Sequence, residues 1–250
     1  MKLCILVLIA MLLMPSQTAA SEYKETMLEP IMPGYTVYAV VSAETNVYKE
    51  RRKVSRVEGQ LQAGMIVEIL MDYSAKWYLV EETDLGIKGW VESDALIIPN
   101  DEPALKSELT TQMLENYINS LNFESETEYL IYTDLLRQHT HVFTGKNGEW
   151  KFLHTFVCAS GKNETPTTRG TFKISERGSW FYSRRLGSGG KFWVRFNETY
   201  LFHSVSMNNA KQIIDPTLGE RVSSGCIRLS VEDAEWIYKN IPERTTVIIN

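Results

Sequence analysis

The stretch Ser223-Ser224-Gly225-Cys226-Ile227-Arg228 decides how the second half of this 250-residue chain is interpreted. A cysteine acts as a nucleophile when a base can take its proton and backbone N–H groups face the oxygen that becomes negative during acyl transfer. Gly225 permits close approach to a substrate, and the N–H groups of Gly225 and Cys226 are candidate donors to that oxygen. The nearest candidate base in sequence is His203. The stretch therefore predicts a thiol site for acyl transfer.

A longer pattern surrounds this cysteine. His203-Ser204 is followed by Leu218-Gly219 and then by the stretch from Ser223 to Leu229. Upstream, Ala159-Ser160-Gly161 precedes Thr165-Pro166-Thr167-Thr168-Arg169-Gly170-Thr171-Phe172-Lys173-Ile174. These two motifs, in this order, strongly resemble the L,D-transpeptidase catalytic domain family of secreted thiol enzymes that cross-link bacterial peptidoglycan. The resemblance covers roughly half the chain, from residue 128 to the C-terminus.

The resemblance implies a role for each residue of the site. Cys226 attacks the carbonyl of a donor stem peptide, expels the terminal D-amino acid and forms a thioester. An amine of a neighbouring stem then accepts the acyl group. His203 moves the protons, which suits a side chain that titrates near neutrality, and the backbone carbonyl of Ser204 orients its ring. Gly225 contributes to the oxyanion hole.

Three further residues are expected to meet the substrate. Arg228 lies two positions beyond Cys226, so on a strand it shares the same side. Its guanidinium could bind a substrate carboxylate and lower the thiol pKa, or could form a structural ion pair instead. Ser223 and Ser224 precede Cys226 in the motif; Ser224 stands where many family members carry a histidine, and Ser204 stands where glycine is common.

Composition and the first residues indicate an exported globular protein. The chain is 44% hydrophobic and 23% charged, and its net charge of −5, or −6 without Lys2, argues against nucleic acid as a partner. Lys2 precedes an uncharged apolar run over residues 3–14, then Pro15 and the small residues 18–20. This order predicts a secretory signal, residues 1–20, cleaved after Ala20; an uncleaved membrane anchor is the alternative.

The number of cysteines is consistent with an exported protein. Removal of the signal takes away Cys4 and leaves Cys158 and Cys226, too few for a disulfide scaffold. A bridge between the two stays open from sequence, but it would consume the nucleophile, so we expect free thiols. Cys158 lies in an apolar run, where a buried cysteine acts as a small hydrophobic residue.

The N-terminal half is predicted to be a tether followed by a small β domain. Residues 21–34, with two prolines, favour a tether. Asn46-Val47-Tyr48, residues 61–67 and Trp77-Tyr78-Leu79-Val80 resemble the bacterial Src-homology-3-like (SH3-like) domain, which implies a wall-binding or spacer module over residues 35–98. Trp77 and Trp90 are expected in its core, with a ligand platform as the alternative. Short β-branched and aromatic runs predict antiparallel strands over 35–41, 65–71, 77–81 and 88–91.

Charged residues 49–53 of this domain are expected in a solvated hairpin loop, with contact to an anionic wall polymer as the alternative. Next comes a helical linker over residues 99–122. Its helix, about 104–121, is predicted from apolar side chains at every fourth position from Leu105 to Leu121.

The catalytic domain is expected over residues 123–250. A turn over 145–148 predicts a hairpin, and a short helix should begin after Ser230 and stop at Pro242. Residues 187–190 are expected to form a mobile loop at the cleft rim. The predicted fold class is mainly β: a small SH3-like barrel followed by a β-rich L,D-transpeptidase domain with a few short helices. Strands are predicted over 129–133, 138–144, 150–158, 193–196, 199–203 and 247–249.

The predicted function is that of an exported cysteine L,D-transpeptidase. Its partners would be peptidoglycan stem peptides and the bacterial cell wall, with carbapenem inhibition and a role in wall organisation and cell shape. No metal-ligand spacing occurs, no cofactor is expected, and His139, His141 and His154 are expected to be structural. Two alternatives remain: an L,D-carboxypeptidase that hands the thioester to water, and a non-catalytic wall-binding protein.

Overall fold

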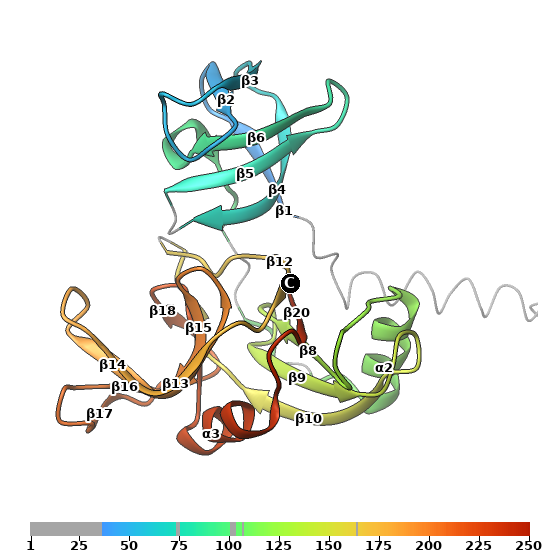
Figure 1. Ribbon diagram of the computed structural model, residues 1–250, viewed down its shortest axis with the longest axis vertical. Helices are drawn as coiled ribbons and strands as arrows, with labels where there is room; N and C mark the ends of the chain where they lie inside the picture. The colour runs from blue at the N-terminus through green and yellow to red at the C-terminus, as the bar shows by residue number, and fades with distance from the viewer. Residues whose placement is uncertain (1–36, 74–75, 101–103, 107, 164) are drawn as a thin grey trace, which may run out of the picture. The chain divides into compact units, whose positions relative to one another are not determined.

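The computed structural model of the chain describes residues 37–73, 76–100, 104–106, 108–163 and 165–250. The predicted secretory signal (1–20) and tether (21–34) lie outside the described residues. The described part is mainly β, as predicted (Figure 1). Neither of its α-helices has the length and apolar character of a membrane span.

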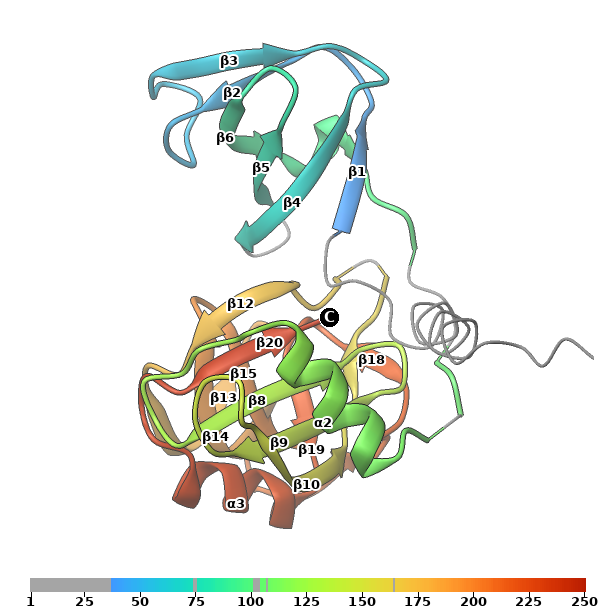
Figure 2. The ribbon, with the colours of Figure 1, turned by 90° about the vertical axis from the view of Figure 1, so that its right-hand side faces the viewer.

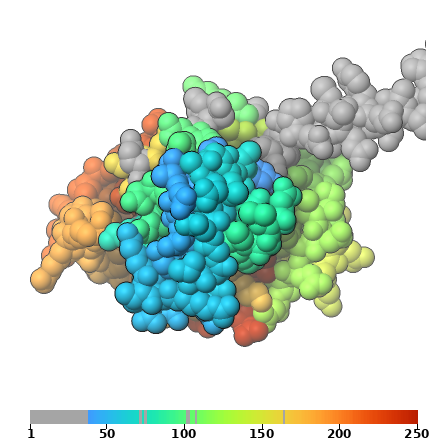
Figure 3. All heavy atoms as spheres, turned by 90° about the horizontal axis from the view of Figure 1, so that it is seen from above, coloured from blue at the N-terminus to red at the C-terminus, as the bar shows by residue number. Residues whose placement is uncertain are grey.

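The first folded part is a curled sheet of seven strands, all paired antiparallel, in the order β3-β2-β6-β5-β4-β1-β7 (Figure 2). The antiparallel arrangement was predicted; the likeness to SH3-like domains stays a prediction. Figure 3 shows the atoms of this domain, blue to green, as one continuous body. The strands are β1 (Val37–Val41), β2 (Thr45–Tyr48), β3 (Val57–Leu61), β4 (Ile66–Tyr73), β5 (Trp77–Glu82), β6 (Ile87–Glu92) and β7 (Leu96–Ile97).

The two tryptophans of this sheet do not belong to its core, which corrects the prediction. Tyr78 and Val80 of β5 and Val91 of β6 are buried, while Trp77 and Trp90 alternate with them and are half-buried. Because successive side chains of a strand point to opposite faces, the tryptophans lie on the outer face. Residues 49–53 are exposed and connect β2 to β3, as expected of a hairpin loop.

The linker helix is shorter than predicted. Helix α2 spans Thr111–Ser120, so the residues from 104 to 110 that the structure describes are not helical. Thr110 ends the extended segment because its hydroxyl accepts a hydrogen bond from the Met113 N–H, 3.3 Å away, and so caps the helix. The helix buries Leu114 and Ile118, whereas Leu105, a residue of the predicted apolar stripe, is exposed.

The second folded part contains two larger sheets. One has the order β10-β9-β8-β20-β12; the other has the order β17-β16-β14-β15-β19, with β13 paired to β14, and a short pair joins β11 to β18. The strands are β8 (Tyr129–Asp134), β9 (His139–Thr144), β10 (Lys151–Val157), β11 (Ser160–Gly161), β12 (Gly170–Lys173), β13 (Arg177–Ser183), β14 (Ser188–Asn197), β15 (Tyr200–Ser204), β16 (Ser206–Met207), β17 (Ile213–Asp215), β18 (Arg221–Ser223), β19 (Ile227–Leu229) and β20 (Thr246–Ile249).

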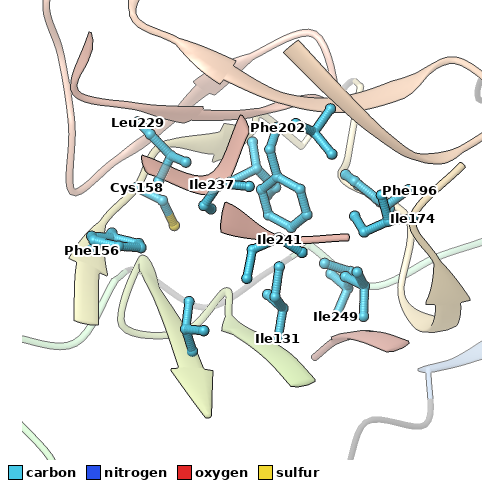
Figure 4. Packing of buried hydrophobic residues seen from close by; sticks show 14 of the residues in the cluster. Ile131, Phe156, Cys158, Ile174, Phe196, Phe202, Leu229, Ile237, Ile241 and Ile249 are labelled. Carbon is cyan, nitrogen blue, oxygen red and sulfur yellow. The ribbon is translucent and has the colours of Figure 1, made fainter. Parts of the chain in front are cut away.

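One apolar core holds these sheets together. Ile131 of β8, Phe202 of β15 and Ile249 of β20 meet there, each with no exposed surface (Figure 4). Cys158 lies in the same core, and both Cys158 and Cys226 are free thiols, as predicted. Burial raises the pKa of the Cys158 thiol to about 12, so it stays protonated at physiological pH.

The last helix, α3 (Val231–Asn240), begins after Ser230 and ends before Pro242, as predicted, and it covers this core. The Ser230 hydroxyl accepts a hydrogen bond of 3.0 Å from the Asp233 N–H and starts the helix. Ala234 and Ile237 are buried against the core. The helix follows β19 directly, so its packing helps to fix the strand that carries the residues just after Cys226.

Residues 187–190 were expected as a mobile loop, but Ser188, Gly189 and Gly190 are the first residues of β14 and pair with β13. The turn between these strands is residues 184–187. Glycine is required in this strand because a Cβ on Gly190 would lie 2.5 Å from Nδ1 of His203. The glycines therefore allow a packed strand against the histidine.

Candidate active site

A parallel strand pair brings the predicted catalytic residues together. In the register of β15 and β19, His203 stands opposite Arg228, and Cys226 directly precedes β19. Cys226, His203 and Arg228 all line one cavity of about 370 Å³, as do Ser223 and Ser224. The other lining residues are Lys162, Thr165, Phe181, Arg185, Leu186, Ser188, Gly189, Thr199, Tyr200 and Ser206.

The ring of His203 contacts the backbone, as the family resemblance implied. Its Nδ1 lies 2.6 Å from the carbonyl oxygen of Ser204. Because a carbonyl oxygen only accepts hydrogen bonds, Nδ1 carries the proton in this contact and Nε2 of the neutral ring keeps its lone pair. The ring of Phe181 meets the imidazole edge to face, with 5.0 Å between centroids. The histidine is thus held in the tautomer of a general base.

Burial sets the charge of this pair at rest. His203 is 6% exposed, and burial lowers its pKa to about 4, although the hydrogen bond to Ser204 favours the charged form. Burial also raises the pKa of Cys226, against the hydrogen bond from the Leu201 backbone and the positive charge of Arg228. The sequence led us to expect a histidine that titrates near neutrality. Burial instead favours a neutral thiol at Cys226 and a neutral imidazole at His203, because it disfavours the charged form of each.

The loop that carries Cys226 is held by its own hydrogen bonds. The Ser223 hydroxyl donates to the Cys226 carbonyl at 2.6 Å and accepts from the Gly225 N–H at 3.0 Å. Gly225 has φ +110°, and a Cβ there would lie 2.4 Å from the ring of Tyr200. Only glycine fits such a position without strain. The Gly225 N–H is therefore engaged by Ser223, whereas the Cys226 N–H bonds to no other residue that the structure describes.

Arg228 is engaged in an ion pair, which was the alternative to a substrate contact. Its Nη1 lies 2.6 Å from Oδ2 of Asp215 in β17. Hydrogen bonds donated by Thr217, and then the Arg228 guanidinium, lower the pKa of Asp215, so the carboxylate is ionised. Asp215 thus offsets the positive charge that Arg228 presents to the thiol. The sequence held no signal for this pairing because only the tertiary fold joins the two strands.

The cavity is basic at its rim. The structure places Ser223 1% exposed with its hydroxyl used inside the loop, whereas Ser224 is exposed at the cavity. Lys162 and Arg185 are exposed and also line the cavity. Among the described lining residues none is acidic. A substrate with a carboxylate near its reacting carbonyl suits this charge pattern.

The remaining histidines lie away from this cavity. His141 is buried in β9 beside Tyr132, and burial lowers its pKa to about 3. His154 of β10 packs against the ring of Trp236, with 4.4 Å between centroids. His139 is half-buried on β9, next to His141. None of them lines the cavity that holds Cys226.

A cysteine beside a cavity, with a histidine whose ring is oriented by a third group, defines the class of thiol acyl-transfer sites. Residues 128–249 match the family model described as YkuD: L,D-transpeptidase catalytic domain. That part of the chain, which contains Cys226, His203 and Arg228, belongs to the L,D-transpeptidase catalytic domain family.

Comparison with individual proteins gives similar relatives. The Bacillus subtilis (strain 168) protein named "Putative L,D-transpeptidase YciB" is 40% identical over 107 residues, which cover 39% of this chain and 55% of that protein. A solved Clostridium acetobutylicum protein, a fused Zn-dependent amidase/peptidase/peptidoglycan-binding domain-containing protein, is 36% identical with a TM-score of 0.49, covering 56% of this chain and 59% of that one. The chain thus spans a little over half the length of these two relatives.

A solved L,D-transpeptidase from Mycobacterium smegmatis covers more of the chain. It is 20% identical with a TM-score of 0.40, and the match covers 74% of this chain and 82% of that one.

Proposed function

We propose that this protein is an exported cysteine L,D-transpeptidase that cross-links or modifies peptidoglycan stem peptides outside the bacterial cytoplasm. The observation that carries the proposal is the arrangement of Cys226 and His203 on one cavity, with the free Nε2 of His203 available because Ser204 holds Nδ1. The family of the catalytic domain supports the substrate class.

In this mechanism the thiol and the imidazole begin neutral. As Sγ of Cys226 attacks the stem carbonyl, its proton passes to Nε2 of His203, and the negative oxygen of the tetrahedral adduct accepts from the Cys226 N–H. The imidazolium returns the proton to the amine of the departing D-amino acid, which leaves a thioester. An acceptor amine then attacks the thioester carbonyl and loses a proton to Nε2, and the thiol forms again.

The acceptor decides between transpeptidation and hydrolysis. Amine and water would reach the thioester from the same cavity, so a product assay is required. Incubation with a defined tetrapeptide stem should release the terminal D-amino acid, and an added amine should appear in the product.

Release without amine incorporation would indicate an L,D-carboxypeptidase instead. No release, and no adduct of wild-type protein with a carbapenem while the thiol of Cys226 remains free, would indicate a wall-binding protein without catalysis. The variant Cys226→Ser is the control in each assay.

A further inference from the structure

A threonine outside the loop of the nucleophile holds that loop in place. Thr167 is 3% exposed. Its hydroxyl accepts a hydrogen bond of 2.8 Å from the Gly161 N–H and donates one of 2.9 Å to the Gly225 carbonyl oxygen. An N–H only donates and a carbonyl only accepts, so both roles of the hydroxyl are fixed. Its single proton is therefore directed at Gly225.

The bond to Gly225 has a consequence for Cys226. The Gly225 carbonyl and the Cys226 N–H belong to one planar trans peptide unit, in which C=O and N–H point in opposite directions. A hydroxyl that fixes the oxygen at one end therefore fixes the direction of the N–H at the other. That N–H bonds to no other described residue, and in the proposed reaction it faces the developing oxyanion.

Other contacts of the loop hold different groups. The Gly225 N–H is held by Ser223. The Ser223 carbonyl accepts from the Lys162 N–H at 3.1 Å and from the Thr165 hydroxyl at 3.2 Å. These bonds fix the peptide units before Gly225. Among the described side chains, the hydroxyl of Thr167 is the one that bonds to the peptide unit between Gly225 and Cys226.

The hydroxyl is itself anchored. Gly161, its donor, lies in β11, which pairs with β18 opposite Ser223. A Cβ on Gly161 would lie 2.2 Å from the carbonyl oxygen of Thr165 and 2.7 Å from the Thr167 nitrogen, so these two segments are in close contact. The strand pair and the Thr167 hydroxyl therefore connect the sheet to the peptide unit of Cys226 through consecutive hydrogen bonds.

We propose that Thr167 is a positioning residue that aims the Cys226 N–H at the oxyanion. This inference rests on the proposed acyl transfer, but its test uses no stem peptide. An activated ester, p-nitrophenyl acetate, acylates the thiol through a tetrahedral oxyanion: the S–C bond forms, nitrophenolate leaves and the thiol proton passes to His203. Iodoacetamide alkylates the same thiol by displacing iodide from a saturated carbon, with no oxyanion.

Each reagent is used on the full chain, and modification of Cys226 is followed by mass spectrometry. Thr167→Val keeps the shape of the side chain and removes the hydroxyl. This substitution should slow acylation by roughly 10-fold to 100-fold, where the upper value is typical of a missing oxyanion donor. The alkylation rate should be unchanged. Thr167→Ser should stay close to wild type.

The neighbour Thr168 offers a matched control, since it is 4% exposed and its hydroxyl has no hydrogen-bond partner in the described structure. Thr168→Val should leave both rates unchanged. If Thr167→Val does not fold, Thr167→Ala, which leaves room for water, is expected to show the same selective loss.

Equal losses of acylation and alkylation in the Thr167 variants, or no loss of either, would overturn the inference. A protein that fails to process any stem peptide, yet shows the selective loss with the ester, would refute the proposed function and retain this inference.

Discussion

His203 stands directly opposite Arg228 in the parallel register of β15 and β19. The guanidinium lowers the pKa of both His203 and the Cys226 thiol, while Asp215, 2.6 Å away, offsets its charge. Asp215 is therefore expected to raise the pKa of the Cys226 thiol without contacting it.

Asp215→Asn should leave the charge of Arg228 uncompensated and lower the thiol pKa. A fall of about half a pKa unit would raise the rate of iodoacetamide alkylation roughly 3-fold at a pH below that pKa. Arg228→Gln should change the rate in the opposite direction. An unchanged or slower rate in Asp215→Asn would contradict this account of the ion pair.

The resting thiol is expected to be protonated at neutral pH. Because burial raises the pKa of Cys226 above the ordinary value of 9.0, the thiolate absorbance should appear only above that pH. The difference between wild type and Cys226→Ser isolates the signal, and Cys158, with a pKa of about 12, titrates later. A midpoint below neutrality would show a thiolate–imidazolium pair and refute the neutral one.

Acid should destabilise the fold through its buried histidines. The pKa of His203 is 6.5 when exposed and about 4 in the fold, so the unfolded chain binds more protons between these values. The free energy of unfolding should fall as pH drops through this window, by on the order of 3 kcal/mol for this residue. Urea unfolding of wild type and His203→Gln at a series of pH values measures this pH dependence of the free energy of unfolding. The same slope in both would exclude His203 as the source.

Gly225 should tolerate no side chain. Gly225→Ala combines a φ of +110° with a Cβ 2.4 Å from the ring of Tyr200, and we expect a loss of more than about 2 kcal/mol of stability together with loss of acylation. Gly148→Ala is the matched control, since φ is +79° with nothing within 4 Å of its Cβ, and should cost only about 1 kcal/mol. Equal losses in thermal unfolding would mean that the contact with Tyr200 does not matter.

The basic rim is expected to select anionic donors. Arg185 lines the cavity and Arg184 does not, so the adjacent arginines form a matched pair. Arg185→Gln should raise KM by about 2- to 5-fold for stems with a free carboxylate, as expected for an exposed ion pair, and not for amidated stems. Arg184→Gln should change neither. An equal effect of both substitutions would indicate general charge rather than a specific contact.

The sequence predicted best where local pattern decides structure. The apolar and aromatic run of residues 129–133 predicted β8, and Ser230 predicted the start of α3. It failed where tertiary packing decides. The glycine-rich stretch 187–190 suggested a loop, but Ser188, Gly189 and Gly190 are strand residues, and Gly190 packs against the ring of His203, where a Cβ would not fit.

Two predictions, one about a side-chain position and one about the start of a helix, were also wrong. In β5 the alternation with the buried Tyr78 and Val80 puts Trp77 on the outer face, whereas it was expected in the core. The four-residue repeat that starts at Leu105 predicted a helix from about residue 104, but the helix begins only after its N-cap, Thr110.

Within the site, the motif pointed to Cys226 and His203, which line one cavity, and to the carbonyl of Ser204, which contacts the His203 ring. The sequence did not reveal Asp215 as the partner of Arg228 or Gly225 as the partner of the Thr167 hydroxyl, because each pair is joined only by segments that meet in the folded chain. The neutral charge state of the pair likewise follows from burial, which spacing in the sequence does not reveal.

The proposed acyl transfer requires Cys226 to carry a stem fragment as a thioester. The most direct measurement is the intact mass of the protein after brief incubation with a tetrapeptide stem and acid quenching, followed by peptide mapping. We expect an added mass equal to the stem without its terminal D-amino acid, located on Cys226 and absent in Cys226→Ser. Turnover of the stem with no such adduct at Cys226, or with the adduct on another residue, would contradict it.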